Sequence, residues 1–261
     1  MGTPIGYYGP FLRELERALD AVVEPFEMRG QGASDENVRR GADFGYREFV
    51  EEDLPARVER LAATFPGRPL YLIAHSLGAQ VSVLASPRFA GRVAGLILIA
   101  AGTAHFRAWP LRIRWRVWGF VEGVHLLSRV FPWYPGKFVG FGGDQPKRLM
   151  RDWTFNARTG RYHFDGSAQS TEARERELSR VELPILSIAI DADPIAPAGA
   201  EAELLAHVPR SPVTRVTVGG VQSHTPWRRH FTWARQPEEI VEVVGRWLAE
   251  REARDRDDSP G

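Results

Sequence analysis

The chain has 261 residues and no cysteine, and its 34 basic residues nearly balance its 33 acidic residues, for a net charge of +1. The lack of cysteine excludes disulfides, thiolate nucleophiles and cysteine-ligated zinc or iron–sulfur centres. The balanced charge gives no support for nucleic-acid binding. The length suits one α/β domain with an inserted subdomain. Because the sequence shows neither a leader-like start nor an apolar run of about 18 residues, we expect a cytoplasmic protein.

The N-terminal part alternates between helical and extended patterns. Residues 11–20 have leucines on one helical face and predict a helix. Residues 21–27 predict a short strand. A further helix is expected over 46–65, with a kink or restart in its middle, where Asp53 and Pro55 interrupt the helical pattern.

Residues 69–80 predict an apolar strand that runs into a sharp turn at Ser76 and then into a helix. Such a strained turn needs small residues two positions before and after the serine, and here these are Ala74 and Gly78. Alanine at the first position, where glycine is usual, crowds the turn slightly. The pattern predicts a nucleophile elbow in which the Leu77 N–H is the first oxyanion donor. The alternative is a buried serine that only caps the helix.

Residues 105–170 interrupt the strand and helix alternation and hold five of the eight tryptophans. They predict an inserted cap. Within it, residues 111–118 alternate arginine with apolar residues, which by periodicity alone favours a strand, although the following residues 120–130 fit a helix better, so the pattern leaves both open. Large rings bury much apolar area, so a cap that closes over a pocket explains these residues better than attachment to a membrane. We therefore expect no membrane contact. The candidate substrate-binding rings are Trp109, Trp115, Trp118 and Trp133.

The rest of the chain returns to the α/β pattern. The continuous apolar run over 93–100 predicts a strand buried on both faces, and Pro237 begins a clear amphipathic helix. The alternation implies a mainly parallel sheet. The expected strands are 93–100, 183–190 and 213–218. The expected divisions are a first core half over 1–104, the cap over 105–170, a second core half over 171–250 and a disordered tail over 251–261.

A serine hydroxyl becomes a good nucleophile only when a histidine accepts its proton and a carboxylate orients that histidine. After such an elbow the chain order is serine, acid, histidine. The strand that ends at Ile190 is followed by Asp191 and Asp193, and we choose Asp193 as the acid, with Asp191 as the fallback. Both aspartates could instead only shape a turn. His224 and His230 both lie between the last strand and the last helix, so either could be the base.

These motifs together resemble the α/β-hydrolase superfamily, and more narrowly the bacterial hydrolases related to serine aminopeptidases and lysophospholipases. The likeness covers roughly residues 1–250 and includes Tyr7-Tyr8-x-Pro-Phe and the loop Arg29-Gly-x-Gly-x-Ser34. In that group the base lies in a Gly-His-Phe-x-aromatic-x-Arg string. His230 and the residues after it match this string, with Arg229 in place of the glycine. The resemblance therefore favours His230 over His224.

The resemblance implies a serine hydrolase with no metal or cofactor that cleaves an ester or thioester, less readily an amide, of a lipophilic small molecule. The alternatives are acyl transfer or elimination on the same fold, or a catalytically impaired binding protein. Such proteins have two or three strands before the point where this chain begins, so N-terminal strands are expected to be missing. The second oxyanion amide would then come from Met1 or Gly2, and we choose Gly2.

Overall fold

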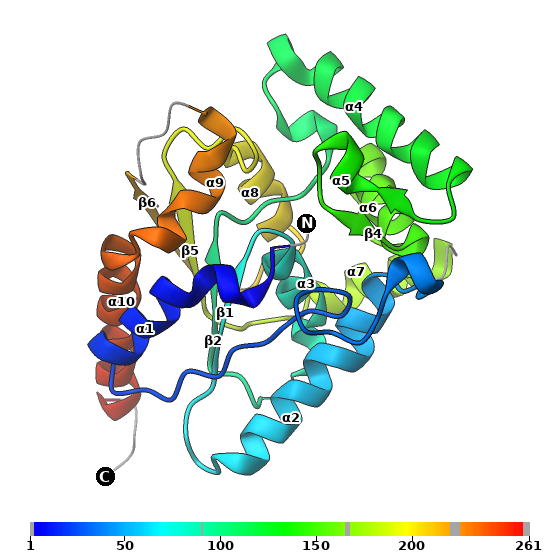
Figure 1. Cartoon of the computed structure of the whole chain (residues 1–261). Coiled ribbons are helices and arrows are strands. Elements are labelled where there is room, and N and C mark those ends of the chain that lie inside the picture. Colours follow the sequence, from blue (N-terminus) through cyan, green and yellow to red (C-terminus); the bar gives the residue numbers. More distant parts are fainter. Residues whose placement is uncertain (1–2, 90, 165–167, 220–224, 258–261) are drawn as a thin grey trace.

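A four-stranded parallel sheet forms the centre of the computed structural model, which describes residues 3–89, 91–164, 168–219 and 225–257 (Figure 1). The order of its strands is β1-β2-β5-β6. The mainly parallel sheet expected from the sequence is confirmed, and each of the four strands lies inside a predicted range. The strands are β1 (Tyr71–His75), β2 (Gly95–Ile99), β5 (Ile185–Ile190) and β6 (Val213–Val218).

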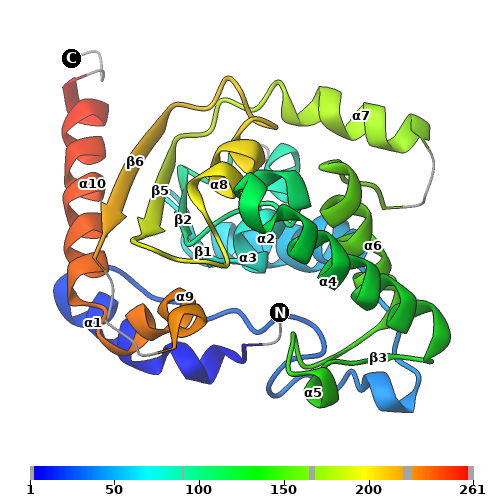
Figure 2. The same cartoon turned by 90° about the horizontal axis from the view of Figure 1, so that it is seen from above.

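Helices cover both faces of this sheet, as Figure 2 shows from above. On one face lie α2 (Leu54–Thr64), α3 (Leu77–Ala85), α7 (Ala168–Leu178) and α8 (Ala198–Leu205). On the other face lie α1 (Gly9–Ala18) and α10 (Glu238–Asp257).

Strand β2 joins the two halves of the core because all five of its residues are buried. Its side chains alternate between the faces, as the two-residue period of a strand requires. Leu96 and Leu98 pack in the cluster with α2 and α3, whereas Ile97 and Ile99 pack in the cluster with α1 and α10.

The segment after β2 leaves the sheet and forms a separate layer of helices. It begins with the short helix η5 (Phe106–Ala108) and has its own small core, in which α4 packs on α6. The boundaries of the cap and of the two core halves stay predictions. The elements of this layer are α4 (Leu111–Val130), β3 (Tyr134–Pro135), α5 (Gly136–Val139), β4 (Asp144–Gln145) and α6 (Lys147–Thr159).

Two local expectations were wrong, and one open question is answered. Residues 21–27 form no strand, and no described strand pairs with them. Residues 111–118, for which the pattern left strand and helix open, are helical and form the first part of α4. The tail is helical as far as Asp257, where pairs such as Glu250 with Arg254 extend α10.

The helix expected over 46–65 is present in two parts. A π-helical turn, η3 (Glu48–Asp53), precedes α2, and Pro55 occupies the first turn of α2. Proline is tolerated there because the first N–H groups of a helix have no intrahelical partner. The predicted restart at Asp53 and Pro55 is confirmed.

Candidate active site

Ser76 occupies the turn between β1 and α3 with φ 53° and ψ −115°. Its N–H donates to the Ile99 carbonyl at 3.1 Å, and its own carbonyl accepts from the first turn of α3. A Cβ added at Gly78 would lie 3.8 Å from the Ala74 Cβ, which is ordinary contact. Alanine therefore fits at the position where the sequence suggested crowding.

Strained backbone conformations in the described part of the chain lie at one edge of the sheet. Three non-glycine residues there have positive φ, and each follows the carboxyl end of one of three neighbouring strands: Ser76 after β1, Ala100 after β2 and Ala192 after β5. Each such residue costs roughly 1–3 kcal/mol and persists only where the surroundings enforce it. Strain of this kind is common at functional sites, so this edge is the first place to look for one.

His230 and Asp193 meet Ser76 at this edge. The Nε2 atom of His230 lies 2.8 Å from the Ser76 Oγ, and its Nδ1 lies 2.6 Å from the Asp193 Oδ2. The second oxygen of Asp193 accepts the backbone N–H of Ile195 at 2.8 Å, which fixes the carboxylate. Both His230 and Asp193 are buried, whereas Asp191, the fallback acid, is exposed.

The hydrogen bonds also define the tautomer of His230. An ionised carboxylate only accepts, so His230 donates its Nδ1–H to Asp193 and keeps a lone pair on Nε2. That lone pair can accept the Ser76 hydroxyl proton. His230 comes from the short helix α9 (Arg229–Thr232). The competing candidate, His224, lies outside the described residues.

Sequence reasoning missed His75, the residue directly before Ser76. Its Nε2–H donates to the His230 carbonyl at 2.9 Å, and the Tyr8 hydroxyl donates to its Nδ1 at 2.7 Å. Burial and the nearby His230 hold the pKa of His75 well below its usual range, so its ring is neutral. Trp233 Nε1 donates to the same His230 carbonyl at 3.0 Å. The backbone of the candidate base is therefore held from two sides.

The N-terminal segment supports the same loop. Tyr8 belongs to the short helix η1 (Ile5–Tyr8), and the neighbouring Tyr7 donates its hydroxyl to the Phe231 carbonyl at 3.2 Å. Arg235 lies over the Tyr7 ring, 4.5 Å from its centroid. The Tyr7-Tyr8 pair was the sequence signal that could have revealed this role, because it belongs to the motif quoted for the resemblance.

Leu77 begins α3, so its N–H is among those that have no intrahelical partner, and it lies directly after Ser76. This is the geometry expected of the first oxyanion donor. Gly2, the candidate for the second, lies outside the described residues. Among the described residues no group of three acidic or histidine side chains is arranged to hold a metal ion.

A cavity of about 840 Å³ opens at Ser76 and runs along the outer side of β1, which is the edge strand of the described sheet. Most of its walls are apolar. Thr3, near the start of the described chain, also borders it. Lining side chains include Leu12, Leu19, Phe26, Leu61, Phe65 and Ile73.

The four candidate tryptophans lie apart from this cavity, as none of them is among its described lining residues. Trp109 donates its Nε1–H to the Pro194 carbonyl at 3.1 Å, beside the Asp193 loop. Trp118 stacks at a tilt on Phe106, and Trp133 is half-buried. Trp115 is exposed on α4. Their role in substrate binding stays a prediction.

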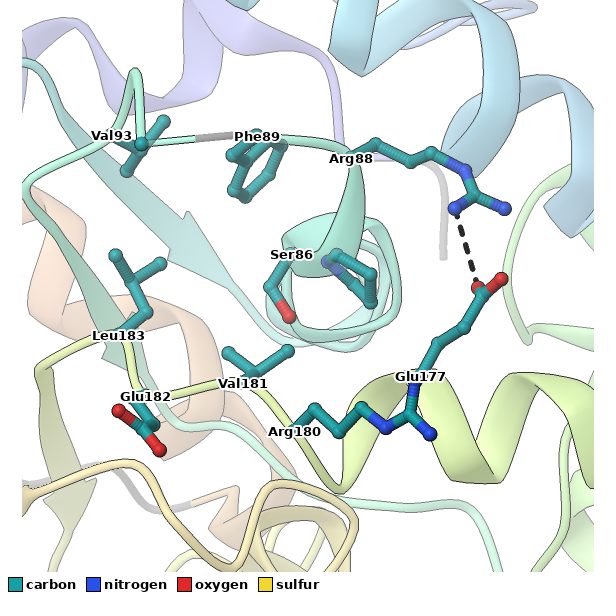
Figure 3. A pocket seen from close by; sticks show the side chains of 11 residues that line it. Ser86, Arg88, Phe89, Val93, Glu177, Arg180, Val181, Glu182 and Leu183 are labelled. Atoms are coloured by element: carbon teal, nitrogen blue, oxygen red, sulfur yellow. Dashed lines mark ion pairs between the residues drawn. The ribbon is translucent and has the colours of Figure 1, made fainter.

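A second hollow, of about 400 Å³, lies at the other end of α3 (Figure 3). An ion pair of 3.3 Å between Arg88 and Glu177 spans it. Its serine, Ser86, directly follows α3 and donates its hydroxyl to the Val83 carbonyl. No described histidine lines this hollow, so it lacks the base that a serine nucleophile needs.

The fold around Ser76 is the α/β-hydrolase fold, which solved structures share over most of this chain. A monoacylglycerol lipase from Paleococcus ferrophilus has a TM-score of 0.56 and 17% identity and covers 96% of this chain and 91% of its own. For the metagenome-derived lipolytic enzymes LipS and LipT the match has a TM-score of 0.60 and 16% identity, over 93% of this chain and 88% of the other.

Residues 1–222 match the serine aminopeptidase family S33, and the chain belongs to this family. It is thus a member of the α/β-hydrolase superfamily. Human monoglyceride lipase is 30% identical over 99 residues, which are 38% of this chain. The match spans 31% of the length of that curated relative.

Proposed function

We propose that this protein is a serine hydrolase that cleaves an ester or thioester of a lipophilic small molecule, with Ser76 as nucleophile, His230 as base and Asp193 as acid. The hydrogen-bonded chain from the Ser76 Oγ through His230 to Asp193 carries this proposal. Its order along the sequence is that of the α/β-hydrolases.

In this mechanism His230 Nε2 takes the Ser76 proton while the Ser76 Oγ attacks the carbonyl carbon. The tetrahedral oxyanion accepts the Leu77 N–H, and Asp193 stabilises the imidazolium that forms. His230 then gives the proton to the departing alcohol or thiol, which leaves an acyl group on Ser76. A water molecule, deprotonated by the same histidine, releases the acid and restores the serine.

The cavity at Ser76 supports a lipophilic acyl group. It has the volume and apolar lining of a small-molecule site. The human relative named monoglyceride lipase and the Paleococcus ferrophilus structure named monoacylglycerol lipase also favour a glycerol ester of a fatty acid as substrate.

The first test is to replace Ser76 with alanine and to measure p-nitrophenyl ester turnover and fluorophosphonate labelling. We expect labelling to disappear and kcat to fall by about 10⁴-fold or more, because the remaining groups lack a nucleophile. Ser86→Ala is the matched control and should retain both signals. Undiminished turnover in Ser76→Ala would refute the proposal. An acyl-enzyme that resists water but reacts with alcohols would favour acyl transfer.

The second test compares the two histidines. His230→Ala should be as damaging as Ser76→Ala, since members of a triad act as one unit, whereas His224→Ala should retain most activity. The reverse ranking of kcat in the two variants would assign the base to His224.

A further inference from the structure

The outward side of α4 is an apolar stripe. Val121, Val124 and Ser128 are buried against the rest of the cap, and the opposite side faces outward at the edge of the molecule (Figures 1 and 2). The exposed fractions on that side are 78% for Leu111, 71% for Trp115, 61% for Leu126 and 67% for Val130. Their spacings of 4, 11 and 4 residues are close to whole helical turns, so the four side chains share one face.

Two arginines flank this stripe. Arg112 and Arg116 are exposed, and neither forms an ion pair within the part of the chain that the structure describes. No acidic residue occurs between Leu111 and Val121. Arg114 differs, because it turns back and donates to the Arg107 and Trp109 carbonyls. The first half of the outer face therefore combines apolar side chains with unneutralised positive charge.

This combination identifies the partner. Apolar side chains on a helix with flanking arginines favour the interface of an anionic lipid surface, where the chains enter the headgroup region and the cations meet phosphates. A second copy of the same face would bring like charges together, which opposes self-association. None of the described helices is both long and apolar enough to span a bilayer, so α4 would lie along the surface.

We propose that the outer face of α4 binds an anionic phospholipid surface through Leu111, Trp115, Leu126 and Val130, with Arg112 and Arg116 against the phosphates. This proposal departs from two expectations from the sequence, namely no membrane contact and a substrate-binding role for Trp115. Trp115 is exposed and does not border the cavity at Ser76. The helix begins two residues after Trp109, which is bonded to the loop of Asp193. Binding would hold the candidate active site beside the lipid surface.

The proposal is tested by sedimentation with vesicles, in the Ser76→Ala background so that no lipid is hydrolysed. The full chain should sediment with vesicles of phosphatidylcholine and phosphatidylglycerol at 3:1, much less with pure phosphatidylcholine, and less as salt is added. The fluorescence of Trp115 should shift to the blue on binding. Because binding is measured without turnover, its outcome is independent of the proposed catalysis.

The charge-reversed variant Arg112→Glu/Arg116→Glu should lose affinity for the anionic vesicles by at least tenfold, and Arg112→Lys/Arg116→Lys should restore most of it. The matched control, Arg60→Glu/Arg180→Glu, changes two exposed arginines elsewhere and alters the net charge equally. Equal losses in the two charge-reversed variants would overturn the proposal, as would failure of the parent chain to bind anionic vesicles. A dimer that Trp115→Ser dissociates would instead identify the face as an interface between copies.

Discussion

His75 links the start of the chain to the candidate base, because it accepts from Tyr8 and donates to the His230 carbonyl. Its ring also lies 4.6 Å from the His230 ring, measured between centroids. A residue that holds the backbone of a base affects its orientation without touching substrate. Errors of about 1 Å in such a position can cost about 10²-fold in rate.

We expect His75→Phe, which keeps a ring but removes both hydrogen bonds, to lower kcat by about 10²-fold with little change in KM. His75→Gln should recover part of the loss, because its amide can donate to the same carbonyl. Steady-state kinetics across pH 5–9 would test this, since a displaced base also shifts the pH profile of kcat/KM. Tyr7→Phe, which removes only the bond to Phe231, is the control. A loss of stability in His75→Phe with unchanged kinetics would contradict the positioning role.

At the scale of elements, α6 brings a partly buried carboxyl against the segment before η3. Asp152 accepts the Tyr46 backbone N–H at 2.9 Å, and burial raises its pKa from 3.8 to about 7. The raising effect of burial outweighs the lowering effect of its hydrogen bond and of Arg148. The other ionisable groups that face it are Asp43, Glu48 and His163.

Because the pKa of Asp152 is raised on folding, its contribution to the free energy of unfolding is fully present below about pH 4 and is lost as the pH rises through 7. The loss is roughly 4 kcal/mol at most, from the size of the shift. Asp152→Asn should remove this dependence. Urea denaturation at pH 5 and pH 8 would measure it, with Asp20→Asn as an exposed control that leaves the slope unchanged. A slope that persists in Asp152→Asn would refute the assignment.

The sequence predicted β1, β2 and β5 because each is an apolar run next to a turn. It pointed to Ser76 through the strained turn and to Asp193 through its place after a strand, whereas only the family resemblance favoured His230 over His224. The pattern did not decide between strand and helix for the first part of α4, whose outer face carries Leu111 and Trp115 where a helix packed on one side would have polar residues. Sequence reasoning failed for His75. A histidine that bonds to the backbone of another loop leaves no periodic signal, because its partner lies 155 positions away.

At the scale of the whole molecule, the cores differ in how they are connected. Two clusters share β2, so a change in either affects the central sheet. The third cluster lies within the cap and contains Val121, Tyr134, Met150 and Trp153. Proteins open in contiguous cooperative units, and a layer with its own core is a natural unit of this kind.

Two matched substitutions that truncate core side chains distinguish local unfolding of the cap from global unfolding of the protein. Leu98→Ala and Met150→Ala each remove a fully buried side chain, and each should cost about 2–5 kcal/mol in its own cluster. We expect Leu98→Ala to increase amide hydrogen exchange throughout the sheet and the cap, because β2 joins both faces of the core. Met150→Ala should increase it mainly in α4 and α6 and leave β2 and β5 protected. Equal loss of protection in the sheet for both variants would mean that the cap and the sheet unfold together, and that the cap cannot open over Ser76 as a separate unit.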